Sequence, residues 1–363
     1  MKISNYKLIF LIFLLLSFMF FACSRKLTPE PLQISTKQIF ALLQENPQFI
    51  MYMNFKNMRG TEYWRNFIND SLLKAESSFG GLLNTFARIT QTTISTNLDE
   101  LYFTNSWYEE NAIVLRGAFD RNTIYNYLHT DTLFIKINRD DGIVLYTYKP
   151  TQMFFFFKDN FTLCASSSLV QIDKMVAVTD TSKSGLLLND KLMQYISQIL
   201  YKEHFWLITA EKTFVRAIFL NLVESNKTPS GRDTTALLDS AVIKNKSRLD
   251  SLNQLENTAI NKLHQKITYV SFSGKMRNDL RVMIQFGCNN EEDVDYVYKF
   301  FSGVISAIKI GSSFNKSDKN QELFKMLDQI DLKIQDSTIY IRFIVTKDNI
   351  NQIRKLKPLT LTN

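Results

Sequence analysis

Short hairpins are the feature that most constrains the fold of this chain. Residues 132–138 and 142–148 are two β-rich runs that flank a turn ending in Asp141-Gly142, a dipeptide typical of tight hairpin turns. Similar pairs of runs occur at 98–107 with 111–119, 153–157 with 161–166, and 267–276 with 280–288. Strands joined by such short turns must pair antiparallel. The sequence therefore predicts an α+β fold in which hairpins build antiparallel sheets and helices pack on one face of them.

The hairpin pattern occurs twice. The pair of runs at 98–119 is followed by a short helical stretch, and the pair at 267–288 is followed by a helical stretch from Asn290. This weak internal duplication predicts two related halves. The expected organisation is a signal peptide (1–22), a lipidated N-terminus and tether (23–47), an α+β domain (48–224), a polar break with an amphipathic connecting helix (225–266), and a second α+β domain (267–363).

The N-terminus has the pattern of an export signal. Lys2 and Lys7 precede an apolar run from Leu8 to Ala22, which ends at Cys23. A positive segment followed by a short apolar segment is typical of a secretory signal, and the run is short for a membrane span. An uncleaved N-terminal anchor that happens to contain a cysteine is the alternative. Under both interpretations the chain is exported and attached to a membrane.

The apolar run, the small Ala22 and the adjacent Cys23 together resemble the signal peptide of a bacterial lipoprotein. The resemblance covers only the first 23 residues or so and implies that Cys23 is acylated and becomes the mature N-terminus. Two or more acyl chains hold a protein firmly to a bilayer. Ser24, rather than an acidic residue, follows the cysteine, and in such lipoproteins this implies transport to the outer membrane. We therefore expect a cell-envelope protein on the periplasmic face of the outer membrane, and no family is recognised for the mature part.

Composition narrows the range of partners. The formal net charge is +8, but lysine and arginine are spread along the chain and form no basic stripe, so a nucleic-acid partner is not expected. The 29 phenylalanines indicate a packed core rather than disorder. Besides Cys23, the chain contains Cys164 and Cys288, each near the end of a strand-like run, and we expect two separate, buried thiols.

No catalytic or metal-binding motif is present in the sequence. His129, His204 and His264 have no histidine or cysteine at ligand spacing, so neither a metal nor another cofactor is expected. The acidic run 290–295 lacks the spacing of a calcium loop and is typical of the first turn of a helix. A triad assembled from distant residues stays open, so whether the chain is an enzyme is left undecided and a non-catalytic role is favoured.

The run Met153–Phe157 is apolar at every position. In a strand its side chains alternate between two faces, so both faces need to be covered, which favours a central strand. The alternative is that Phe155 and Phe157 line a cavity for a lipid-like ligand. The sequence therefore favours a lipid-anchored, non-catalytic module that binds an unidentified envelope protein, and the alternative is a carrier of an apolar ligand.

Overall fold

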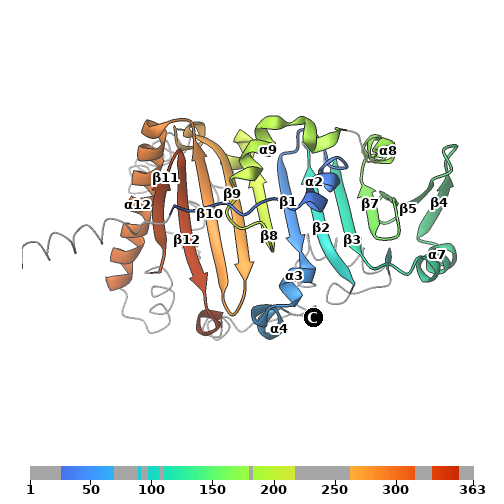
Figure 1. The fold of residues 1–363 in the computed structure, drawn as a ribbon, viewed down its shortest axis with the longest axis horizontal. Helices are drawn as coiled ribbons and strands as arrows, with labels where there is room; N and C mark the ends of the chain where they lie inside the picture. Colours follow the sequence, from blue (N-terminus) through green and yellow to red (C-terminus); the bar gives the residue numbers. More distant parts are fainter. Residues whose placement is uncertain are drawn as a thin grey trace, which may run out of the picture.

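The computed structural model describes residues 26–68, 89–90, 97–106, 110–179, 183–216, 262–314 and 329–350. The described strands are β1 (Phe49–Asn54), β2 (Leu98–Asn105), β3 (Asn111–Gly117), β4 (Phe134–Asn138), β5 (Val144–Tyr148), β6 (Met153–Phe157), β7 (Thr162–Ser166), β8 (Phe205–Thr209), β9 (Ile267–Met276), β10 (Leu280–Cys288), β11 (Asp331–Gln335) and β12 (Thr338–Val345). They form one sheet of 12 strands in the order β11-β12-β10-β9-β8-β1-β2-β3-β7-β6-β5-β4 (Figure 1). The predicted α+β class is confirmed.

Helices cover both faces of this sheet. One face packs against α3 (Phe55–Arg59), α4 (Glu62–Phe67), α7 (Arg121–Thr130) and α12 (Glu291–Phe314). The other packs against α2 (Ile34–Phe40), α8 (Leu169–Ala177), the 3-10 helix η1 (Gly185–Leu188) and α9 (Asp190–Ser197). The expectation of helices on one face was wrong. The central strands are apolar at successive positions, and an apolar side chain on either face is stabilised by removal from water.

The two halves of the sheet follow a similar course, although the first half contains two further strands, β5 and β6, between its edge strand and β7. In the first half, the hairpin β2–β3 leads through α7 to an edge strand, and the chain returns to pair β7 with β3. In the second half, the hairpin β9–β10 leads through α12 to an edge strand, and the chain returns to pair β12 with β10. This agrees with the duplication expected from the sequence.

The halves meet at the centre of the sheet, where β8 pairs with β1 on one side and with β9 on the other. Hydrogen bonding between strands therefore continues from β11 to β4 without a break. The domain boundaries drawn from the sequence stay predictions. Most of the predicted connecting helix lies outside the described residues, and only 262–266 is seen, as helix.

Local predictions of turns and caps were accurate. Gly142 has φ 79° in the β4–β5 turn, a conformation that glycine adopts without strain, and the side chain of Asp141 accepts a hydrogen bond from the Ile143 amide at 3.0 Å. Glu291, Glu292 and Asp293 occupy the first turn of α12, as expected for acids that complement a helix dipole. No described helix is both long and apolar enough to cross a membrane.

Candidate functional site

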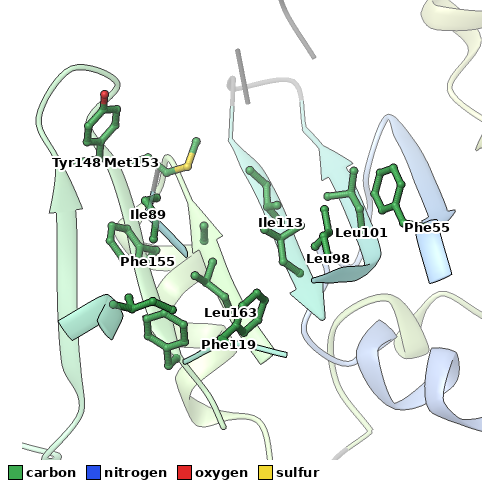
Figure 2. Packing of buried hydrophobic residues seen from close by; sticks show 14 of the residues in the cluster. Phe55, Ile89, Leu98, Leu101, Ile113, Phe119, Tyr148, Met153, Phe155 and Leu163 are labelled. Atoms are coloured by element: carbon green, nitrogen blue, oxygen red, sulfur yellow. The ribbon is translucent and has the colours of Figure 1, made fainter. Parts of the chain in front are cut away.

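The site residues expected from the sequence are not brought together. Cys23 lies outside the described residues. Phe155 is 0% exposed and Phe157 is 8% exposed, and both belong to a large core cluster. Figure 2 shows Phe155 among other members of this cluster. The ring of Phe155 stacks on Tyr146 with 5.5 Å between centroids, and Phe157 meets Tyr125 edge-on at 5.9 Å. Phe156 is buried on the opposite face, so β6 is a central strand covered on both sides.

Four open grooves, with volumes of about 400 to 610 Å³, are found among the described residues. Neither Phe155 nor Phe157 lines any of these four grooves. The assignment of these two residues to a ligand cavity therefore stays a prediction. The largest of the four grooves lies instead beside the N-terminal segment, between Lys26 and the β11–β12 turn.

The N-terminal segment, residues 26–33, is bound to the body along its length and runs across the second half of the sheet to α2 (Figure 1). At its start, the Leu27 amide donates to Oε1 of Gln335 at 2.6 Å, and Nε2 of Gln335 donates to the Leu27 carbonyl at 2.9 Å. Lys26 Nζ lies 3.0 Å from a carboxylate oxygen of Asp336. Leu27 also packs on a small core cluster that includes Leu200.

Glu30 is the residue that fixes the middle of this segment. Its amide donates to the Leu200 carbonyl at 3.0 Å. Its Oε2 accepts from the amides of Lys202 at 2.7 Å and Glu203 at 3.1 Å. Its Oε1 forms an ion pair with Lys275 Nζ at 2.8 Å. Hydrogen bonds to a charged acceptor are stronger than those between neutral groups, so one carboxylate joins the segment to both the loop after α9 and strand β9.

Lys202 belongs to the body of the protein and contacts Glu30 of the N-terminal segment. It is only 4% exposed. Its Nζ donates to the carbonyls of Glu30, of Ser197 at 3.0 Å and of Ile199 at 2.5 Å. The last two carbonyls lie at the C-terminal end of α9, where a cation is favourable. Burial lowers the pKa of Lys202 to about 8, while the negative charge of Glu30 opposes that shift.

Two further groups surround the ion pair of Glu30. Lys275 Nζ also contacts the carboxylate of Glu203, and these two carboxylates raise the pKa of Lys275 although burial opposes the shift. The Glu203 carboxylate in turn has a lowered pKa because of its hydrogen bond to Lys275. His204 is buried with a lowered pKa, and its Nδ1 accepts a hydrogen bond from the Met276 amide at 3.1 Å. We call Glu30, Lys202, Glu203 and Lys275 the N-terminal clamp.

The N-terminal clamp is suited to holding a segment of chain. Its two carboxylates both contact Lys275 Nζ, and its two lysines are engaged as donors. Sequence reasoning missed it because Glu30 and Lys202 are 172 residues apart. One local signal was present. Glu30 stands between Pro29 and Pro31, and prolines favour an extended backbone, which displays the intervening side chain for contact with another surface.

A second polar cluster lies on β1, β2 and β3 beneath α2. Tyr52 donates to Glu100 Oε1 at 2.9 Å, and Arg116 donates to Glu100 Oε2 at 3.0 Å. Tyr102 donates to Thr36 of α2 at 3.4 Å. Burial, followed by the charge of Glu100, raises the pKa of Tyr52 well above its ordinary value, so this phenol stays a neutral donor. The cluster joins α2 to the centre of the sheet.

The remaining reactive groups are shielded. Cys164 and Cys288 are free and buried, as expected, and burial raises the pKa of each thiol to about 12. Such thiols carry almost no thiolate at neutral pH and are poor nucleophiles. Among the described residues, no group of three or more histidine, cysteine, aspartate or glutamate side chains could hold a metal ion.

Comparisons with known proteins give a distant structural likeness only. No family model matches the chain, and no curated protein matches it significantly. Crystal form III of TP0453 has a TM-score of 0.45 and 8% sequence identity, over 87% of this chain and 97% of that one. Crystal form I has a TM-score of 0.43 and 8% identity, over 92% of this chain and 99% of that one. These values are too low to transfer a function.

Proposed function

We propose that this chain is an exported, lipid-anchored envelope protein that acts as a non-catalytic binding or interaction module. The sequence around Cys23 supports the anchor, and the N-terminal clamp is the structural observation that supports a body held close to it. The N-terminal segment begins three residues after Cys23. It is hydrogen-bonded first to Gln335 beside the β11–β12 turn and then, through Glu30, to Lys202. An anchored protein with a free body needs a flexible tether after its lipid, whereas here that part of the chain belongs to the fold.

The spacing sets how far the body can be from its anchor. Three Cα–Cα steps separate Cys23 from Lys26, and three steps span about 11 Å at most. Acyl chains on Cys23 would therefore hold the β11–β12 side of the body close to the lipid headgroups. We place that surface on the periplasmic face of the outer membrane, following the sequence around Ser24.

Metabolic labelling with an alkyne fatty acid tests the anchor. The full chain, expressed in a Gram-negative host, should incorporate the label and remain with the membrane fraction. The Cys23→Ala variant should lose the label, while Cys164→Ala, which changes a buried thiol, should keep it. Labelling that persists in Cys23→Ala, or a wild-type chain without label, would remove the basis for the lipid anchor.

The carrier interpretation has less support. Phe155 and Phe157 fill their space with aromatic contacts, and a ligand would have to displace them. Native mass spectrometry of the full chain after incubation with phosphatidylethanolamine separates the two functions. A mass without lipid beyond the acylated cysteine supports the interaction module, and a one-to-one lipid adduct on the body supports the carrier.

A further inference from the structure

The strand β4 is an open edge of the sheet. Among the described strands it is the last in the order, and it pairs there with β5 alone (Figure 1). The Arg139 amide donates to the Ile143 carbonyl, and the Lys149 amide donates to the Leu133 carbonyl. In an antiparallel ladder the bonded positions alternate, so Ile135 and Ile137 also bond to β5. The backbone groups of Lys136 and Asn138 therefore point away from the sheet.

The side chains on this edge are apolar on one face and cationic on the other. Ile135 is 45% exposed and Ile137 is 37% exposed, and both lie on the face of the sheet that α8 covers further in. Lys136 points to the opposite face, is exposed, and has no ion-pair partner in the described part of the chain. An added strand could bury the two isoleucines and neutralise the lysine at the same time.

The edge is also held in place. Arg139, just after β4, forms ion pairs with Asp141 at 3.0 Å in the turn and with Asp173 of α8 at 2.5 Å. The hairpin is thereby fixed against α8. A strand that is already ordered loses little conformational freedom when another strand pairs with it. An ordered edge of this kind favours docking more than a frayed edge would.

The other edge of the sheet differs. On β11, Lys333 lies 3.6 Å from the carboxylate of Asp331, which also accepts from Arg342 at 2.5 Å. The strand packs on α12, and Gln335 at its end is engaged by Leu27. The one lysine of β11 thus has a carboxylate beside it, whereas Lys136 on β4 has none within ion-pair distance among the described residues. Of the two edges, β4 is the one that offers an unused combination of backbone, apolar and charged groups.

We propose that β4 is a docking edge for an extended segment of a partner protein that carries a carboxylate between two apolar residues. The segment adds to the sheet as a strand, bonds to the backbone of Lys136 and Asn138, pairs its carboxylate with Lys136, and covers Ile135 and Ile137. A second copy of this chain fits less well. Pairing all five residues of β4 with their copies antiparallel places one Lys136 opposite the other, and like charges in that position are destabilising.

This inference names the partner chemistry of the proposed interaction module, but its test does not need the lipid. The probe is an acetylated, amidated peptide with alternating valine and glutamate, and the matched control peptide carries lysine in place of glutamate. Hydrogen exchange of the full chain in detergent is followed by mass spectrometry. The glutamate peptide should slow exchange in residues 134–143 about tenfold or more, and the lysine peptide should not.

Charge reversal gives the decisive comparison. Lys136→Glu should reverse the peptide preference, so that the lysine peptide protects β4 and the glutamate peptide does not. Lys333→Glu on β11 is the matched control and should leave the preference unchanged. Equal protection by both peptides, no protection at millimolar peptide, or a preference that Lys136→Glu does not alter would overturn the proposal. Protection that rises with protein concentration alone, together with dimers in sedimentation, would replace it with self-association.

Discussion

Glu30 shows how a single residue joins a chain terminus to a distant surface. The prolines on either side keep its backbone extended, and its carboxylate meets two amides and the ammonium of Lys275. Without Glu30 the two amides would lose hydration and have no partner, which is costly in a partly buried place, and Lys275 would keep only Glu203. The same carboxylate also opposes the effect of burial on Lys202. Glu30 is therefore the residue that contacts all three other members of the N-terminal clamp.

Replacing Glu30 with glutamine should lower the free energy of unfolding by about 1–3 kcal/mol, because an amide cannot neutralise Lys275 or accept as strongly from the two backbone donors. Urea denaturation of the full chain in detergent measures the change. Hydrogen exchange of residues 26–33 should accelerate in the variant. Glu45→Gln, at an exposed carboxylate, is the matched control and should stay within about 0.5 kcal/mol of wild type. Equal stability of the two variants would contradict the role given to Glu30.

Lys202 should make the free energy of unfolding increase with pH in the alkaline range. Its folded pKa is about 8 and its ordinary value is 10.5, so between these values the unfolded chain binds more protons than the folded chain. The free energy of unfolding should therefore rise with pH through this window. Lys202→Met lacks the ionisable group and should not show this contribution. Urea denaturation at pH 7.5, 9 and 10 measures both proteins, and parallel pH curves for the two would show that the pKa of Lys202 is unchanged on folding.

At the scale of elements, the docking of η1 against α2 depends on Gly185. This residue has φ 55°, and a Cβ atom there would lie 2.3 Å from the Leu43 carbonyl oxygen and 2.5 Å from that of Ala41. Backbone oxygens cannot give way as a flexible side chain can. The close approach of two short elements thus requires a residue without a side chain.

Gly185→Ala should cost about 2 kcal/mol or more, because it adds both backbone strain and a clash with the end of α2. Gly303→Ala is the matched control. A Cβ at Gly303 in α12 meets nothing within 4 Å, so alanine should be neutral or stabilise by up to about 1 kcal/mol through its higher helix propensity. Thermal and urea unfolding measure both. A loss at Gly303 as large as that at Gly185 would show that the contact with α2 is not the cause.

The hairpins could be predicted from the sequence because their determinants are local. Asp141 and Gly142 specify the β4–β5 turn by their own conformational preferences, and the unbroken apolar run Met153–Phe157 predicted a strand covered on both faces. The N-terminal clamp could not be predicted. Glu30 and Lys202 are ordinary charged residues whose contact depends on the whole sheet placing β9 beside the loop after α9. The flanking prolines mark Glu30 as a contact residue, but nothing local identifies Lys202 as its partner.

At the scale of the whole molecule, the two related halves form one sheet because β1 and β8 pair at its centre. Each half ends in an edge strand, and the edges differ in surroundings. The β11 edge lies beside the N-terminal segment, and β4 lies at the opposite end. With neighbouring strands about 4.8 Å apart, the two edges are separated by about 50 Å along the strand order. If Cys23 is acylated as proposed, the anchor and the proposed docking edge are at opposite ends of the strand order.

This separation predicts a fixed orientation on the bilayer. In the acylated chain on liposomes, a fluorophore on Ser337→Cys in the β11–β12 turn should be quenched by headgroup-labelled lipids, and one on Asp140→Cys beside β4 should be quenched far less. The native thiols do not interfere, because burial keeps Cys164 and Cys288 protonated. Inserting twelve glycine and serine residues after Ser24 should reduce the difference, since the anchor no longer limits the distance. Equal quenching at both positions without the insertion would show that the N-terminal clamp does not orient the body, while failure of the chain to bind liposomes would point instead to the anchor.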